Sequence, residues 1–148
     1  MKTAEPPSRV YINEEFEQLL AEQVRHAVDR RRPYAVLICI PQHLPGEDVT
    51  DVADVAAHCV REYVRADDLT GRLNGEIIAV GLPETEASGA RVFAQRLQSD
   101  LSLRSNRLRS TSWEAGIATL PHDGTTADEL LGVAVTSART RRRRLGML

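Results

Sequence analysis

The 148-residue sequence has no run of 18 apolar residues and no charged-then-apolar leader, because its first ten residues, MKTAEPPSRV, are polar and include adjacent prolines. Neither a membrane-spanning helix nor a signal peptide is therefore expected. Cysteine is scarce as well. Cys39 and Cys59 both lie in apolar segments, without the spacing of metal ligands or of a redox pair, so we expect buried thiols. These absences predict a soluble, cytoplasmic protein.

Lysine is almost absent, since 18 of the 19 basic residues are arginine, and an arginine at a functional spacing therefore carries less weight than usual. The formal net charge of −2 gives no reason to expect nucleic acid or an anionic membrane as a partner. The length suits one domain with one hydrophobic core. We expect a flexible N-terminal segment at residues 1–10, where prolines oppose a helix, and a single domain at residues 11–148.

Hydrophobic periodicity predicts a chain in which four helices alternate with strands. The helices are expected near residues 13–32, 52–65, 84–101 and 127–144. The strands are expected at residues 34–40, on both sides of residues 74–75, and at residues 111–120. Asn13 is expected to cap the first helix, and Thr126 with Glu129 to form a capping box for the last.

The order of these elements predicts the fold class. An antiparallel hairpin with helices segregated to the faces indicates an α+β sandwich built on a central, mainly antiparallel sheet. The continuous apolar run at residues 34–40, YAVLICI, suits the centre of that sheet. The polar segment at residues 102–110, SLRSNRLRS, is expected to be a loop.

Residues 65–85, RADDLTGRLNGEIIAVGLPET, resemble the signature region of GGDEF domains, the diguanylate cyclase family. The five signature positions, Gly-Gly-Asp-Glu-Phe in the family, hold Asn74, Gly75, Glu76, Ile77 and Ile78. Residues 116–134, GIATLPHDGTTADELLGVA, are similar to a later segment of the same family. The resemblance implies a nucleotide-cyclase palm-like sandwich, with Asn-Gly keeping the geometry of a tight hairpin turn.

The resemblance also implies that Mg²⁺ would be held by an aspartate ending the first strand and by the glutamate at the fourth signature position. Those places hold Cys39 and Ile77, and Pro41 replaces a second aspartate. A hydrocarbon cannot bind Mg²⁺, and the family's phosphate-cradling and guanine-reading elements are absent. We therefore expect no catalytic residues, no metal and no cyclase activity. In an alternative alignment, Glu76 and Asp48 would form a metal site.

Arg65 and Asp68 keep the Arg-x-x-Asp spacing at which many family members bind cyclic di-GMP. A guanidinium donates to O6 and N7 of guanine, and a carboxylate accepts from N1 and N2. The family's further arginine corresponds to Arg96, with Arg91 as the alternative. The resemblance thus implies an inactive regulatory domain that binds cyclic di-GMP and signals through a homodimer or a partner signalling protein.

The same loss of signature residues supports an alternative from another class, a protein interaction or scaffold domain with no nucleotide binding. In that interpretation Asp68 simply begins a strand or caps the preceding helix, and Arg65 stands near it because arginine is abundant. A pair bonded only to itself or to backbone, with no pocket beside it, would favour this alternative.

Overall fold

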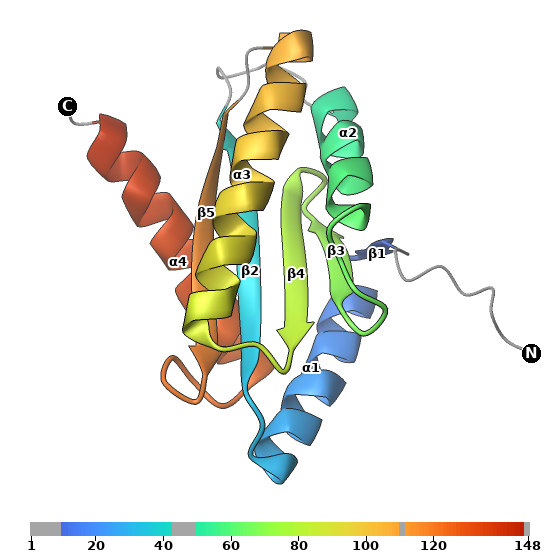
Figure 1. Ribbon diagram of the computed structural model, residues 1–148, viewed down its shortest axis with the longest axis vertical. Coiled ribbons are helices and arrows are strands. Elements are labelled where there is room, and N and C mark those ends of the chain that lie inside the picture. Colours follow the sequence, from blue (N-terminus) through green and yellow to red (C-terminus); the bar gives the residue numbers. More distant parts are fainter. Residues whose placement is uncertain (1–9, 43–49, 110–111, 147–148) are drawn as a thin grey trace, which may run out of the picture.

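A five-stranded sheet organises the chain (Figure 1). The computed structural model describes residues 10–42, 50–109 and 112–146. The strands are β1 (Val10–Ile12), β2 (Tyr34–Gln42), β3 (Leu69–Leu73), β4 (Ile77–Pro83) and β5 (Ser112–Leu120). The helices are α1 (Asn13–Arg30), α2 (Thr50–Arg61), α3 (Ala87–Arg109) and α4 (Ala127–Gly146). The strand order is β1-β3-β4-β2-β5, with β1 parallel to β3 and every other pair antiparallel, which confirms the predicted α+β class.

Strand β2 lies inside the sheet because its apolar run can be covered on both faces. Every residue of β2 except Gln42 is buried, and the strand pairs with β4 on one side and β5 on the other. The sequence predicts this strand at the centre of the sheet; it is an interior strand, but β4 takes the central place among the five.

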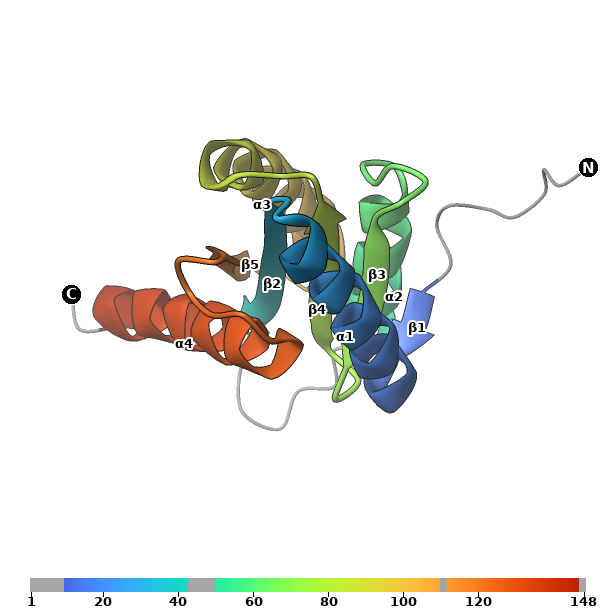
Figure 2. The same cartoon turned by 90° about the horizontal axis from the view of Figure 1, so that it is seen from below.

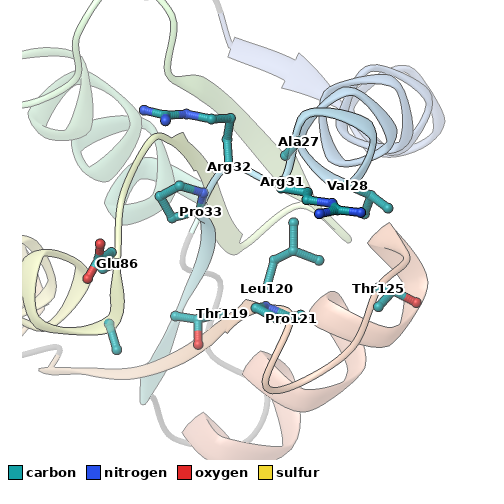
Figure 3. A pocket seen from close by; sticks show the side chains of 11 residues that line it. Ala27, Val28, Arg31, Arg32, Pro33, Glu86, Thr119, Leu120, Pro121 and Thr125 are labelled. Atoms are coloured by element: carbon teal, nitrogen blue, oxygen red, sulfur yellow. The ribbon is translucent and has the colours of Figure 1, made fainter.

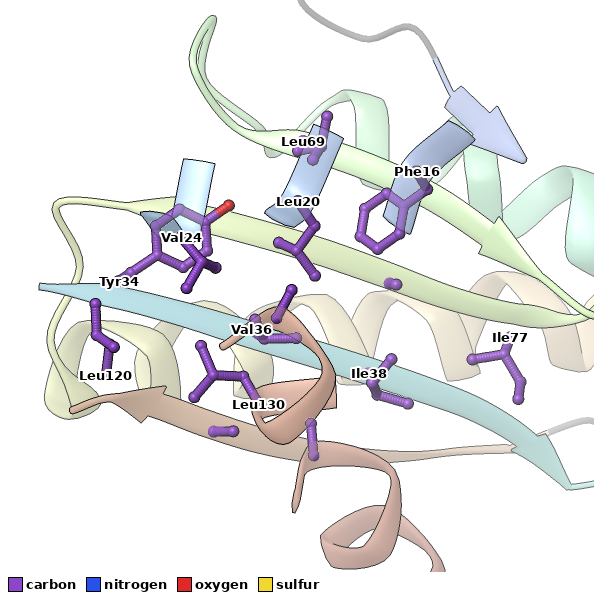
Figure 4. Packing of buried hydrophobic residues seen from close by; sticks show 14 of the residues in the cluster. Phe16, Leu20, Val24, Tyr34, Val36, Ile38, Leu69, Ile77, Leu120 and Leu130 are labelled. Carbon is purple, nitrogen blue, oxygen red and sulfur yellow. The ribbon is translucent and has the colours of Figure 1, made fainter. Parts of the chain in front are cut away.

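The helices form a layer on each face of the sheet (Figure 2). Helices α1 and α4 cover one face, and α2 and α3 cover the other, so the sheet separates two clusters of buried side chains. Figure 4 shows the α1/α4 cluster, in which Phe16, Leu20 and Val24 of α1 pack with residues of the sheet and of α4. No helix in the described ranges is both long enough and apolar enough to cross a membrane.

Helix α4 packs directly on the backbone of β5 at Gly116. A Cβ atom at this position would lie 2.0 Å from the carbonyl oxygen of Ala134 and 2.6 Å from the amide nitrogen of Ala138. Because any larger residue at position 116 would collide with the α4 backbone, only glycine allows α4 to approach β5 so closely.

Half of the predicted capping box forms at the start of α4, because the Glu129 amide donates to Thr126 Oγ1 at 3.2 Å. The Glu129 carboxylate accepts the backbone N–H of Thr125 at 2.8 Å, one residue before the expected Thr126.

A polar network joins α3 to the end of α2. The hydroxyl of Tyr63 donates to Asp100 Oδ2 at 2.8 Å, and Arg104 Nε donates to Asp100 Oδ1 at 3.3 Å. These hydrogen bonds, that of Tyr63 above all, hold the pKa of the Asp100 carboxyl below its usual range. Arg104 also pairs with Glu62 at 2.8 Å, so polar and charged groups link α3 to the start of the loop that follows α2.

The structure corrects several local predictions. A short strand, β1, includes Val10, which lies in the segment expected to be flexible, whereas residues 1–9 lie outside the described residues. Asn13 makes no cap hydrogen bond, because the capping position is Ile12. The expected loop after residue 101 is helical as far as Arg109, which agrees with the high helix propensity of arginine and leucine. Helix α2 ends at Arg61, so residues 62–68 form a loop.

Candidate functional site

The loop between α2 and β3 is closed by a carboxylate at its end. Asp68 Oδ2 accepts the backbone N–H of Arg65 at 2.8 Å, and the Asp68 N–H donates to the Arg65 carbonyl oxygen at 3.1 Å. An aspartate that bonds a nearby backbone amide is a common way to fix a tight turn. The Arg-x-x-Asp spacing thus has a local structural cause, independent of any ligand.

The guanidinium of Arg65 joins this turn to the far end of β4. Arg65 donates from Nη2 to Asp68 Oδ1 at 3.1 Å and from Nε to Oδ2 at 3.4 Å. The same Nη2 lies 2.9 Å from the Pro83 carbonyl oxygen and 3.2 Å from Thr85 Oγ1. The Asp68 side chain is 1% exposed and that of Arg65 is 59% exposed. Asp68 therefore anchors a guanidinium whose outer face stays open to solvent. The side-chain hydrogen bond to Asp68 raises the pKa of Arg65 above its usual value.

A pocket of about 400 Å³ lies beside Arg65 and Asp68. One wall is aromatic, since the rings of Tyr63 and Phe93 meet edge to face with centroids 6.3 Å apart. Exposed carboxylates, among them Glu86, stand on the rim. The pocket combines two aromatic side chains with an anchored guanidinium, an arrangement that could contact a base with hydrogen-bond acceptors on its edge.

The structure does not bring Arg96 into this pocket. Arg96 is exposed on α3, and its spacing from Gly89 and Phe93 places it on the same side of the helix, one turn beyond the lining residues. The alternative, Arg91, lines a different pocket between α3 and β5. Of the three predicted binding residues, only Arg65 and Asp68 are in contact.

The signature turn has the geometry that its sequence predicts. Asn74 and Gly75 both have positive φ, at 52° and 83°, and the Glu76 N–H donates to the Leu73 carbonyl oxygen at 3.3 Å. Arg72 supports the turn, because its Nε donates to the Gly75 carbonyl oxygen at 2.8 Å.

Two distant segments hold the same hairpin. Asn13, expected to cap α1, instead accepts the backbone N–H of Asn74 with its side-chain oxygen at 2.9 Å. Asn13 has a φ of 42°, which asparagine tolerates better than most residues. From the other side, Arg72 pairs with Asp54 of α2 at 2.6 Å. The hairpin tip is therefore fixed to both the start of α1 and the middle of α2.

The positions that the resemblance assigned to one metal site lie on opposite faces of the sheet. Cys39 pairs across the strands with Ile78 and shares its buried cluster, whereas Ile77 belongs to the α1/α4 cluster (Figure 4). Cys39 is fully buried, and burial raises the pKa of its thiol to about 12. Among the described residues no group of three or more His, Cys, Asp or Glu could hold a metal, and Asp48 lies outside them.

Sequence reasoning missed the partners that complete the pocket. Thr85 and the Pro83 carbonyl hold the guanidinium, and Tyr63 and Phe93 supply the wall. The two aromatic residues fit the apolar faces of the predicted helices, and that pattern does not distinguish a core residue from a pocket wall. Only the structure shows that both are half-buried beside Arg65.

The central antiparallel sheet, the helices on both of its faces and the tight signature hairpin together define a nucleotide-cyclase palm-like domain. Comparison with protein families matches residues 6–144 to the family described as diguanylate cyclase, GGDEF domain. The chain therefore belongs to the GGDEF family. A search of curated proteins finds no match.

Solved structures share the fold at low sequence identity. A DGC protein from Thermotoga maritima gives a TM-score of 0.75 at 17% identity, covering 90% of this chain and 99% of that one. The GGDEF domain of FimX from Pseudomonas aeruginosa gives 0.78 at 19%, covering 97% and 96%. The GGDEF domain of DgcB from Caulobacter crescentus, solved in complex with c-di-GMP, gives 0.79 at 16%, covering 97% and 90%.

Proposed function

We propose that this GGDEF domain is a catalytically inactive regulatory module that binds cyclic di-GMP beside Arg65 and signals through protein association. The observation that carries the proposal is the half-exposed Arg65 guanidinium, fixed by buried Asp68 at the edge of an aromatic-walled pocket. Because Nε and Nη2 of Arg65 already donate to Asp68, Pro83 and Thr85, Nη1 is the nitrogen that can donate to the O6 and N7 edge of guanine, and it is held in place without first being ordered. The complex of DgcB with c-di-GMP supports the choice of ligand.

In this conformation the two residues have different roles. Both Asp68 carboxylate oxygens accept bonds from Arg65, so Asp68 is a positioning residue and Arg65 is the group that faces a ligand. Arg96 joins the site only if the ligand extends one helical turn along α3 beyond Phe93.

The proposed inactivity follows from the chemistry at Cys39. A fully buried thiol with a raised pKa stays protonated, and Mg²⁺ prefers carboxylate oxygens. Glu76 is then the only carboxylate among the five signature positions. Incubation with GTP and Mg²⁺, followed by chromatography, should yield no cyclic di-GMP, and detectable product would refute the proposed inactivity.

Calorimetric titration with cyclic di-GMP tests the binding function. We expect micromolar or tighter binding, which Arg65→Ala abolishes and which Arg61→Ala, an exposed arginine nearby, leaves unchanged. Cyclic di-AMP should bind far more weakly, because adenine presents an amino donor where guanine presents O6. Sedimentation with and without ligand should show a ligand-dependent increase in mass.

A second candidate function keeps the fold purely as an interaction surface. It is favoured by the self-contained bonding of the pair, since Arg65 already contacts Asp68, Pro83 and Thr85. The pocket beside them favours ligand binding instead. Absence of heat with cyclic di-GMP at high concentration would select the interaction domain.

A further inference from the structure

A separate pocket of about 480 Å³ lies between the C-terminal end of α1 and the connection from β5 to α4 (Figure 3). Its lining is mainly apolar, with Ala27 and Val28 from α1 on one side and Leu120 and Pro121 on the other. Val28, on the α1 side of the pocket, is 39% exposed. The volume falls in the range of small-molecule sites.

Arg31 stands at this pocket with an uncompensated charge. Among the residues that the structure describes, its guanidinium makes no hydrogen bond or ion pair, and its side chain is exposed. Arg31 ends α1 in the left-handed conformation, with φ of 55°, a place that helices usually give to glycine. The sequence therefore keeps a charged side chain at a position where glycine would be less strained.

The other charged groups at the pocket limit what it can hold. Arg32 is already paired with Glu84 at 2.6 Å. Glu86 lines the pocket on the side away from Arg31, as Figure 3 shows, and it also lines the pocket beside Arg65. Within the described part of the chain, one unpaired cation therefore faces one carboxylate across an apolar space. A single negative charge beside Arg31 would be attracted by that cation and would lie on the side of the pocket away from Glu86.

We propose that this pocket binds a small organic acid with one carboxylate and an apolar body. The carboxylate pairs with Arg31, because a guanidinium matches the two carboxylate oxygens. The apolar body packs over Val28 and Pro121, which are exposed, and removes part of their surface from water, with the buried Leu120 at the floor. This site is distinct from the pocket beside Arg65 and does not depend on cyclic di-GMP binding.

Octanoate is a suitable probe, with 1-octanol as its uncharged counterpart, and binding is followed by amide shifts in two-dimensional NMR spectra. We expect saturable shifts at Val28, Arg31 and Leu120. Arg31→Gln should weaken octanoate binding at least about tenfold, as loss of a charge-assisted hydrogen bond predicts, and leave octanol binding unchanged. Arg25→Gln removes the same charge from an exposed position on α1 outside this pocket and should have no effect.

Arg31→Gly provides a second variant that keeps the fold, because glycine adopts a φ of 55° without strain. It should lose octanoate binding to the same degree as Arg31→Gln. Absence of saturable shifts in the parent protein would overturn the proposal, and so would equal weakening by the Arg25 and Arg31 variants. Because these variants leave Arg65 and Asp68 intact, the outcome is independent of the cyclic di-GMP titration.

Discussion

Replacing Ile77 by glutamate tests whether the fourth signature position is structural in this chain. Ile77 is 7% exposed and packs in the cluster between the sheet and helices α1 and α4. A glutamate there would restore the family's residue type but would place a carboxylate in an apolar layer. Since Cys39 lies on the opposite face, a carboxylate at position 77 could not share a cation with one at position 39.

The expected loss in the free energy of unfolding of Ile77→Glu has two parts. Loss of a buried isoleucine side chain removes about 2 kcal/mol of transfer free energy. Burial also raises the pKa of the new carboxyl, and a tenfold weaker acid costs about 1.4 kcal/mol more to ionise in the folded protein. We therefore expect Ile77→Glu to lower the free energy of unfolding by about 3 kcal/mol near neutral pH.

The pH dependence separates the two parts. A carboxyl whose folded pKa is raised destabilises the protein fully above that pKa, and the penalty disappears as the pH falls below the unfolded pKa of about 4.3. Ile77→Gln loses the same packing without a titrating group, so it serves as the control. Urea unfolding across this pH range should show the two variants converging in acid and diverging near neutrality.

Two results would refute this reasoning. One is an Ile77→Glu protein as stable as the parent at neutral pH, which would mean that position 77 is not a core position. The other is cyclic di-GMP production from GTP and Mg²⁺ by the variant carrying both Cys39→Asp and Ile77→Glu. That product would show that the opposite faces seen here do not prevent joint metal binding.

Gly116→Ala should destabilise the domain by at least about 2 kcal/mol in thermal or urea unfolding, because its Cβ meets α4 backbone, whereas Gly132→Ala, with nothing within 4 Å, should be neutral or stabilising. Equal effects of the two variants would contradict the close packing. Asn13→Ala should speed hydrogen exchange of the Asn74 amide, which it leaves without its acceptor. The lowered pKa of Asp100 gives stability that is present above the ordinary carboxyl pKa and lost as pH falls through the folded value. Asp100→Asn should therefore flatten the acid limb of the stability profile, and an unchanged limb would exclude this contribution.

The elements with strong local signals could be predicted from the sequence. Asn74 and Gly75 specify the turn through their tolerance of positive φ, and the helix cap at Thr126 uses a hydrogen bond within one helical turn. The strand at residues 34–40 is an uninterrupted apolar run, which indicates burial on both faces. Each of these signals lies within a few neighbouring residues.

The features that the sequence did not reveal depend on contacts between distant segments. Strand β1 is too short to show a period, and its pairing with β3 is what makes it a strand. Asn13 has the side chain of a helix cap, but its acceptor oxygen reaches a turn 61 residues later. The spacing of Arg65 and Asp68 was predictable, whereas their bonds to Pro83 and Thr85 needed the fold.

The two isoleucines of the hairpin have a consequence for how this sequence can change over time. Ile77 faces the α1/α4 cluster and Ile78 faces the α2/α3 cluster, so adjacent positions each contribute to a different buried layer. A mutation that returns a carboxylate to position 77 must be accompanied by repacking around α1 and α4, and an aspartate at Cys39 would disturb the other layer. A return toward the family signature therefore passes through less stable intermediates, and selection for folding alone would tend to keep the hairpin as it is.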